Sequence, residues 1–351
     1  MSATLAWKLN RLRAMDFAEI GWRLRQALAA ALERCGLGLA RGGDPGDGAA
    51  GSPWAERWPE NLDPAPYVAA AERLLAGRWD VLSLRDCALG FPPRWNRDPK
   101  TGIEAPLDFG KAIDYRDPSV VGDIKYLWEP NRHLELVTLA QAWRLTRNER
   151  YAQGARRLLE SWLEQCPYPR GAQWTSALEL GVRLVNWAIA WHLLGGEGRE
   201  LHGRWLAAVY QHCHFISRNL SRHSSANNHL FGELTGLFIA SLTWPLWPES
   251  AGWRESAHRA LEGEALRQIG ADGVDREQAL WYQQEVADMM LLALLFGRAN
   301  GAELSPRFAA RLERMLEFVA AVMDSAGHVP MIGDADDGAL VRLARESEFC
   351  P

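Results

Sequence analysis

The sequence predicts an all-α protein in which antiparallel helices pair into hairpins. From residue 64 onward, segment after segment places apolar residues at helical spacing, and strand-like alternation is nearly absent. The chain has 351 residues, of which 48% are hydrophobic and 24% are charged, so it can bury one large core or two modest ones. These proportions are those of a folded protein and not of a disordered chain.

Each expected helix is bounded by Gly, Pro or a polar cluster. The expected helices span residues 64–76, 131–146, 149–165, 177–194, 199–220, 228–243, 252–268, 278–299 and 306–324. Helical hairpins without a strict sequence repeat suit an (α/α) toroid or an irregular α-solenoid. We favour an (α/α) toroid, an incomplete barrel of helical hairpins over residues 64–325, because its helix ends and loops line one cleft.

Two segments precede the toroid. Residues 1–40 are expected to form an N-terminal amphipathic helical segment that caps the domain. Its apolar residues, with basic residues between them, are Leu5, Leu9, Leu12, Ile20, Leu24 and Leu28. Residues 41–63 are a Gly/Pro-rich linker with nothing to bury. Within the toroid, residues 77–128 are rich in Pro, Gly, Trp and Asp, which predicts a long ordered loop with a functional role.

Charge and motif content exclude several classes of function. A net charge of −5 and a pI near 6.0 give no long-range attraction to nucleic acid. The five cysteines include no C-x-x-C pair and the histidines lack H-x-x-x-H or H-E-x-x-H spacing, so no metal is expected. The sequence holds neither G-x-G-x-x-G nor a phosphate-binding loop, and no cofactor is expected.

The N-terminal region and the longest apolar stretches bear on the cellular location of the protein. Charged residues interrupt the N-terminal region where a signal peptide needs an apolar core, so we expect a soluble, cytoplasmic protein. The longest apolar stretches, residues 234–247 and 289–296, fall short of the ~20 residues that span a bilayer. No integral membrane segment is therefore expected.

The first candidate site is S-S-A-N-N-H-L-F-G-E, residues 224–233, directly ahead of an apolar run. Ser225 or Asn227 suits an N-cap, which puts Asn228 and His229 in the first turn of the helix. Backbone N–H groups at that end point outward unpaired and favour an anion, and an Asn amide adds a donor. The stretch alone is equally consistent with two capping asparagines and a surface histidine.

A second candidate site is D-I-K-Y-L-W-E-P-N-R-H, residues 123–133, built around a proline, Pro130, that suits the first turn of a helix. Lys125 and Arg132 could each bind a carboxylate or a sulfate. The alternative is an ion pair between Glu129 and Arg132 that holds the loop in place.

Three further features carry an alternative structural explanation. Ser176 and Glu179 match an S-x-x-E capping box, and Arg183 follows Glu179 by one turn, where the two could pair. The seventeen tryptophans, among them Trp128 and Trp174, either face sugar rings or fill a helical core.

The last candidates lie near the C-terminus. Tyr282 enters a helix just ahead of an apolar stretch, where a lone tyrosine usually serves packing. Residues 331–343, M-I-G-D-A-D-D-G-A-L-V-R-L, are a Gly/Asp-rich turn that leads into an alternation typical of the start of a strand.

Five motifs in this order resemble the heparinase II/III family of polysaccharide lyases, which includes alginate lyase relatives. They are W-N-R-D-P-K-T-G (95–102), K-Y-L-W-E-P-N-R-H (125–133), S-A-N-N-H-L-F-G-E (225–233), E-Q-A-L-W-Y (277–282) and G-D-A-D-D-G (333–338). The chain departs from the family pattern at Ala279, where a Ser is usual, and at Gln283, where a His often follows the Tyr.

The resemblance implies an (α/α) toroid followed by an antiparallel β-sandwich, with an acidic polysaccharide as the partner in the cleft between them. It implies a catalytic Asn-His pair at Asn228 and His229 and a catalytic Tyr at Tyr282. Residues 326–351 would then be the start of a truncated β-sandwich domain, the rest of which is missing from the chain. The family also offers the cell envelope or periplasm as an alternative location.

The expected substrate-binding residues are Lys125, Trp128, Glu129, Asn131, Arg132, Trp174, Arg183 and Glu277. In β-elimination of a uronate, Asn228 and Arg132 would neutralise the carboxylate while Tyr282 or His229 takes the C5 proton.

Two other functions stay open on the sequence. One is an inverting glycoside hydrolase on a helical toroid, with Glu277 and Asp334 as the paired carboxylates. The other is a non-catalytic saccharide-binding fragment that keeps the cleft without the chemistry.

Overall fold

The computed structural model describes residues 15–55, 62–195, 201–335 and 338–344. Four long helices form its inner layer and pack one against the next in chain order. They are α6 (Leu134–Thr146), α8 (Ala177–Leu194), α10 (Asn228–Thr243) and α12 (Leu280–Ala299). Helices α8 and α10 are apolar around most of their circumference and are buried along almost their whole length.

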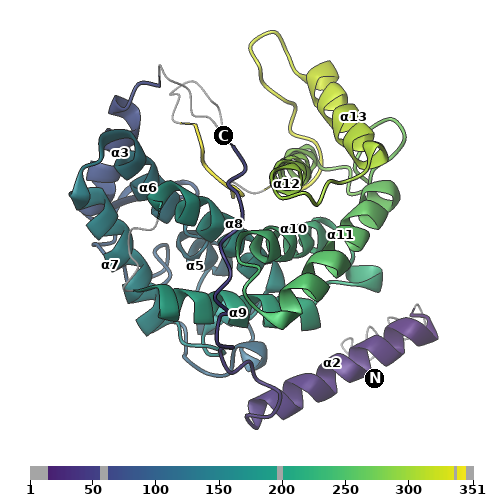
Figure 1. The fold of residues 1–351 in the computed structure, drawn as a ribbon, viewed down its shortest axis with the longest axis horizontal. Helices are drawn as coiled ribbons and strands as arrows, with labels where there is room; N and C mark the ends of the chain where they lie inside the picture. Colours follow the sequence, from purple (N-terminus) through teal and green to yellow (C-terminus); the bar gives the residue numbers. More distant parts are fainter. Residues whose placement is uncertain (1–14, 56–61, 196–200, 336–337, 345–351) are drawn as a thin grey trace.

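A second set of helices covers the outside of the inner layer. They are α7 (Glu149–Gln165), α9 (His202–Arg218), α11 (Pro248–Gln268) and α13 (Pro306–Val322). Each packs against the inner helix that precedes it in the chain, and α3 (Ala65–Leu75) packs against α6. Figure 1 shows the hairpins as an open arc that runs from α3 to α13. The predicted helical toroid, with an incomplete ring, is confirmed.

The loop expected over residues 77–128 contains more structure than predicted. It holds an antiparallel hairpin of β1 (Arg78–Val81) and β2 (Leu84–Ala88), then α4 (Pro118–Val121) and most of α5 (Ile124–Asn131).

The expected helix start near residue 131 is wrong, because Pro130 lies near the C-terminal end of α5 instead of in a first turn. His133, in the left-handed conformation with φ of 64°, separates α5 from α6.

The N-terminal segment is helical in the part that the structure describes. Helix α2 (Phe17–Arg34) begins after Asp16, whose side chain accepts the Glu19 N–H, and it extends away from the arc in Figure 1. Leu5, Leu9 and Leu12 lie outside the described residues. Among residues 41–55 the linker forms no helix or strand. Gly46 hydrogen-bonds to Leu246 in the α10–α11 connection, and Gly51 to Thr243, the last residue of α10.

The chain crosses the inner helices again after α13. No strand is present in residues 326–335 and 338–344, and residues 336–337 and 345–351 lie outside the described part. Leu340 is buried, and its carbonyl accepts the Asn186 side-chain amide at 2.8 Å. The carbonyl of Leu343 accepts the Gln141 amide at 2.9 Å. The β-sandwich therefore stays a prediction.

Glycines set the distance between α8 and α10. A Cβ at Gly181 would collide with the carbonyl oxygen of Gly232, and a Cβ at Gly236 would collide with the backbone of Gly181. Backbone atoms cannot move aside as a flexible side chain can. The two helices therefore touch through their main chains, and this contact fixes the position of the N-terminus of α10 relative to α8.

We predict that Gly181→Ala destabilises the protein by about 1–3 kcal/mol through overpacking at this crossing. The matched control is Gly252→Ala on α11, where a Cβ would meet no atom within 4 Å. That change should leave stability unchanged or raise it by about 0.5–1 kcal/mol, since Ala is the better helix former. Urea unfolding measures both, and equal stabilities for the two variants would contradict the close contact.

Candidate active site

A cavity of about 110 Å³ lies where α5, α8, α10 and α12 meet. Seven predicted site residues line it: Lys125, Trp128, Glu129, Arg132, Asn228, His229 and Tyr282. The remaining lining residues, none of which was a predicted site residue, are Leu82, Leu178, Glu179, Glu285 and Gly338. Residues more than 150 positions apart in the chain are thus gathered by the ends of the inner helices.

The N-terminus of α10 is capped from two sides. Of the two predicted N-cap candidates, Ser225 and Asn227, the N-cap is Asn227, and its side-chain oxygen accepts the His229 N–H at 3.1 Å. Glu277 accepts the Asn228 N–H at 2.7 Å and the Asn227 side-chain amide at 3.4 Å. The prediction of unpaired backbone N–H groups at this end is therefore wrong. The buried Asn228 side chain, and not the helix end, is left to face the cavity.

A buried ion pair forms the floor between α5 and α8. The Arg132 guanidinium donates from Nε and Nη2 to the two oxygens of Glu179, both at 2.9 Å. Glu129 lies 3.4 Å from Arg132 Nη1. Burial opposes the charge of Arg132, yet the carboxylates of Glu179 and Glu129 raise its pKa well above the ordinary value.

This ion pair corrects two expectations. The Ser176 side chain makes no capping hydrogen bond, so the predicted capping box with Glu179 does not form. Glu179 pairs with Arg132 and not with Arg183. Because the Arg132 guanidinium already donates two hydrogen bonds to the Glu179 carboxylate, Arg132 is a weaker candidate for binding an anionic substrate than its sequence context indicated.

The polar side chains of α10 and α12 meet on the other side of the cavity. The Asn228 amide donates to Glu285 at 3.4 Å, and both side chains are buried. The Tyr282 hydroxyl donates to Asp334 at 3.2 Å. Glu285 follows Tyr282 by three residues, so the two lie on the same face of α12, a spacing that could have revealed Glu285 from the sequence.

Three predicted substrate-binding residues lie in the core behind the cavity. Asn131 donates to the carbonyls of Trp95 and Leu127. Trp174 packs edge-on against His212 at 4.7 Å between ring centroids. Asn131 and Trp174 are each 1% exposed, so their side chains pack and hydrogen-bond within the interior of the toroid and do not face the cavity.

Arg183 is the third of these core residues and is fully buried. It donates to the carbonyl oxygen of Asn131 at 2.5 Å and to His212 Nε2 at 3.0 Å, and it stacks over Trp162. Burial and the Arg183 charge lower the pKa of His212 well below its ordinary value. The neutral ring donates from Nδ1 to the carbonyl oxygen of Ala208 and accepts from Arg183 at Nε2. Arg183 in turn holds the end of α5 through its hydrogen bond to Asn131.

The remaining predicted residue, Glu277, lines a second and larger groove beside the cavity.

Within the described residues, no group of three or more His, Cys, Asp or Glu side chains is arranged to hold a metal ion. None of the helices that the structure describes is long and apolar enough to cross a membrane.

Comparison with known proteins assigns the family. Residues 97–347 match the model for the heparinase II/III N-terminus. The chain belongs to the heparinase II/III family. A heparin-sulfate lyase from Bacteroides stercoris is 23% identical over 67% of this chain and 38% of its own length. One from Pedobacter heparinus is 22% identical over 65% of the chain and 36% of its own length.

Solved structures show the same fold. Heparinase III aligns over 77% of this chain and 41% of its own, with a TM-score of 0.58 and 18% identity. The heparan sulfate lyase HepC from Pedobacter heparinus aligns over 79% of this chain and 42% of its own, with a TM-score of 0.54 and 18% identity. The chain therefore spans less than half the length of the relatives it matches.

The pKa of Glu129 yields a stability prediction. Burial, against the opposing effect of Arg132, raises this pKa from 4.5 to about 7. A carboxyl that is harder to ionise in the folded state costs stability as the pH rises between these values, and the loss is complete above about 7. Relative to the parent, Glu129→Gln should therefore gain up to about 3 kcal/mol between about pH 4.5 and about pH 8.

Urea unfolding at several pH values measures this gain, with the exposed Glu317→Gln as the control. The parent and the control should lose stability in parallel as the pH rises, while Glu129→Gln loses less. Parallel profiles for all three proteins would show that Glu129 titrates normally.

Proposed function

We propose that the protein containing this chain is a polysaccharide lyase that cleaves an acidic, uronate-containing polysaccharide by β-elimination. The observation that carries the proposal is the meeting of Asn228, His229 and Tyr282 in one cavity, from the N-terminal ends of α10 and α12. Family membership and relatives named heparin-sulfate lyases support the reaction type.

The first task of such a site is to make the C5 proton of the uronate acidic. That requires the neighbouring carboxylate to be neutralised by donors that remain in place as negative charge develops. We assign this task to the Asn228 amide, assisted by the Lys125 ammonium at the cavity wall. The hydrogen bond from Asn228 to Glu285 at 3.4 Å is long, so the amide can turn to a better acceptor at small cost.

The second task is proton transfer. The imidazole of His229 is exposed at the cavity, and a histidine can accept a proton near neutral pH. We assign it the removal of the C5 proton. The Tyr282 hydroxyl carries its proton in a hydrogen bond to Asp334, and we assign it the protonation of the leaving glycosidic oxygen.

The geometry argues against the two-carboxylate hydrolase. Glu277 is held by the backbone of Asn228 and the side chain of Asn227, where it caps α10. It lines the neighbouring groove and not the cavity that contains Tyr282. A general acid or base has to reach the scissile bond, and this carboxylate is committed elsewhere.

Tyr282→Phe should lower kcat by about 10²–10⁴-fold and change substrate affinity little, because it removes a proton donor and keeps the ring. The assay follows the ultraviolet absorbance of the unsaturated product when the intact protein acts on a panel of uronate polymers. Tyr210→Phe, which removes a hydroxyl from the outer helix α9, is the control. Parental turnover by Tyr282→Phe would refute the role of Tyr282.

Asn228→Ala should weaken both binding and turnover. The contact with the carboxylate exists in the ground state and strengthens as charge develops, so kcat should fall by about 10²-fold or more while KM rises. Steady-state kinetics with the same polymer measure both constants. A variant in which only KM changes would show that Asn228 binds substrate without stabilising the transition state.

A further inference from the structure

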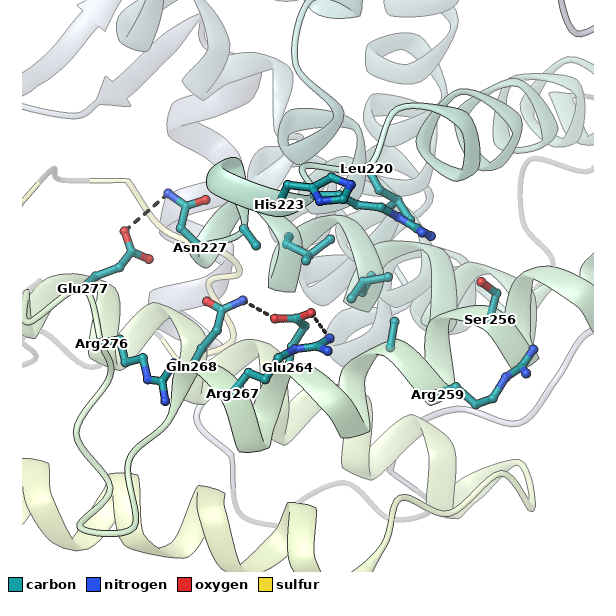
Figure 2. A pocket seen from close by; sticks show the side chains of 15 residues that line it. Leu220, His223, Asn227, Ser256, Arg259, Glu264, Arg267, Gln268, Arg276 and Glu277 are labelled. Carbon is teal, nitrogen blue, oxygen red and sulfur yellow. Dashed lines mark hydrogen bonds and ion pairs between the residues drawn. The ribbon is translucent and has the colours of Figure 1, made fainter. Parts of the chain in front are cut away.

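A groove of about 880 Å³, eight times the volume of the cavity, lies on the outer side of α10. Its walls are the chain that leads into α10 and the second half of α11. Figure 2 shows Asn227 and Glu277 at one end of the groove and Ser256 and Arg259 at the other. From Ser256 to Gln268 the wall on α11 is about 18 Å long, at 1.5 Å per residue.

The floor of the groove is apolar and its rim is basic. Leu220, Leu230 and Leu234 form the floor and are almost fully buried. Four exposed arginines from three stretches of the chain stand around it: Arg222, Arg259, Arg267 and Arg276. Among the described residues, two carboxylates, Glu264 and Glu277, line the same groove, so its described lining is net positive although the whole chain carries −5.

Both carboxylates are already engaged by the protein. Glu264 accepts from Arg267 and, at 2.9 Å, from Gln268, as the dashed lines in Figure 2 show. Glu277 is bound at the N-terminus of α10. Within the described residues, Arg259 contacts the exposed Glu255 through an ion pair at 3.7 Å and a hydrogen bond to its carbonyl oxygen at 3.4 Å, both weak contacts. The Arg222 guanidinium lies over the Trp22 ring. For the Arg276 side chain, the described part of the chain offers no hydrogen bond or ion pair.

The groove adjoins the candidate active site. Asn227 lines the groove and Asn228, the next residue, lines the cavity. Glu277 bonds to both residues and so stands between the two spaces. A polymer held in the groove would therefore leave it at the entrance to α10, beside the residues assigned to the reaction.

We propose that this groove binds the part of an acidic polysaccharide that extends beyond the cleaved linkage. The proposal rests on the function proposed above and adds a second binding site for the same substrate. The length of the α11 wall exceeds a single sugar ring, which suits a chain. Arginine forks match the carboxylates and sulfates of such a chain, and the leucine floor covers the apolar faces of its rings.

The test is the double substitution Arg259→Gln and Arg276→Gln, which removes two charges and keeps polar side chains on the rim. The matched control, Arg254→Gln with Arg307→Gln, removes two charges from α11 and α13 outside the groove. Calorimetry measures the binding of a long uronate polymer and of a short oligosaccharide of the same composition. Both pairs are placed in the Tyr282→Phe protein, so that the polymer is not cut during the measurement.

The groove variant should bind the long polymer about three- to thirtyfold more weakly, as expected for the loss of two exposed ion pairs, and with a smaller dependence on salt. Its binding of the short oligosaccharide should equal that of the control. Equal binding of the long polymer by both variants would overturn the proposal. So would an equal loss for long and short ligands, because the arginines would then act on the cavity or on the fold.

Cleavage assays distinguish a failure of the groove assignment from a failure of the proposed lyase function. With Tyr282 restored, the groove variant should keep the parental kcat on the short oligosaccharide and show a raised KM on the long polymer. If the parent cleaves no uronate polymer but the groove variant still loses affinity for it, the lyase assignment fails and the groove assignment stands. If the parent cleaves the long polymer and the groove variant keeps the parental KM for it, the groove assignment fails and the lyase assignment stands.

Discussion

The buried ion pair between Arg132 and Glu179 is the interaction on which the candidate site depends. It joins the end of α5 to the start of α8 through two parallel hydrogen bonds. Removing one partner of such a pair strands a buried charge and costs about 3–5 kcal/mol. Lys125, Trp128 and Glu129 all project from α5, so this pair, together with the bond from Arg183 to Asn131, holds the wall that they form in place.

The opposite wall depends on main-chain contact. The glycine crossing brings α10 against α8, and the cap made by Asn227 and Glu277 fixes the first turn of α10. Asn228 is thereby presented to the cavity on a rigid element, with its backbone satisfied and its amide directed toward α12. The helix that carries this donor is thus fixed before a substrate binds, and the Asn228 side chain alone has to turn from Glu285 toward a developing negative charge.

The sequence predicted the helices well where apolar periodicity was long. The observed α8 and α10 match residues 177–194 and 228–243, and Asn227 is one of the two N-cap candidates that the sequence offered. Local patterns failed where a distant residue decided the outcome. Glu179 matched a capping box with Ser176, but Arg132, 47 positions earlier, takes its carboxylate. Composition likewise could not show that Trp174 faces the interior instead of a sugar.

The central claim, that this site breaks a glycosidic bond by elimination, has a direct test. The intact protein is allowed to cleave a uronate polymer in water enriched in heavy oxygen, and the masses of the products are measured. Elimination takes no oxygen from water, so the account predicts products that carry none of the label and a new chain end lighter by one water molecule than a hydrolytic end. Incorporation of one labelled oxygen at each cut would show hydrolysis and contradict the account.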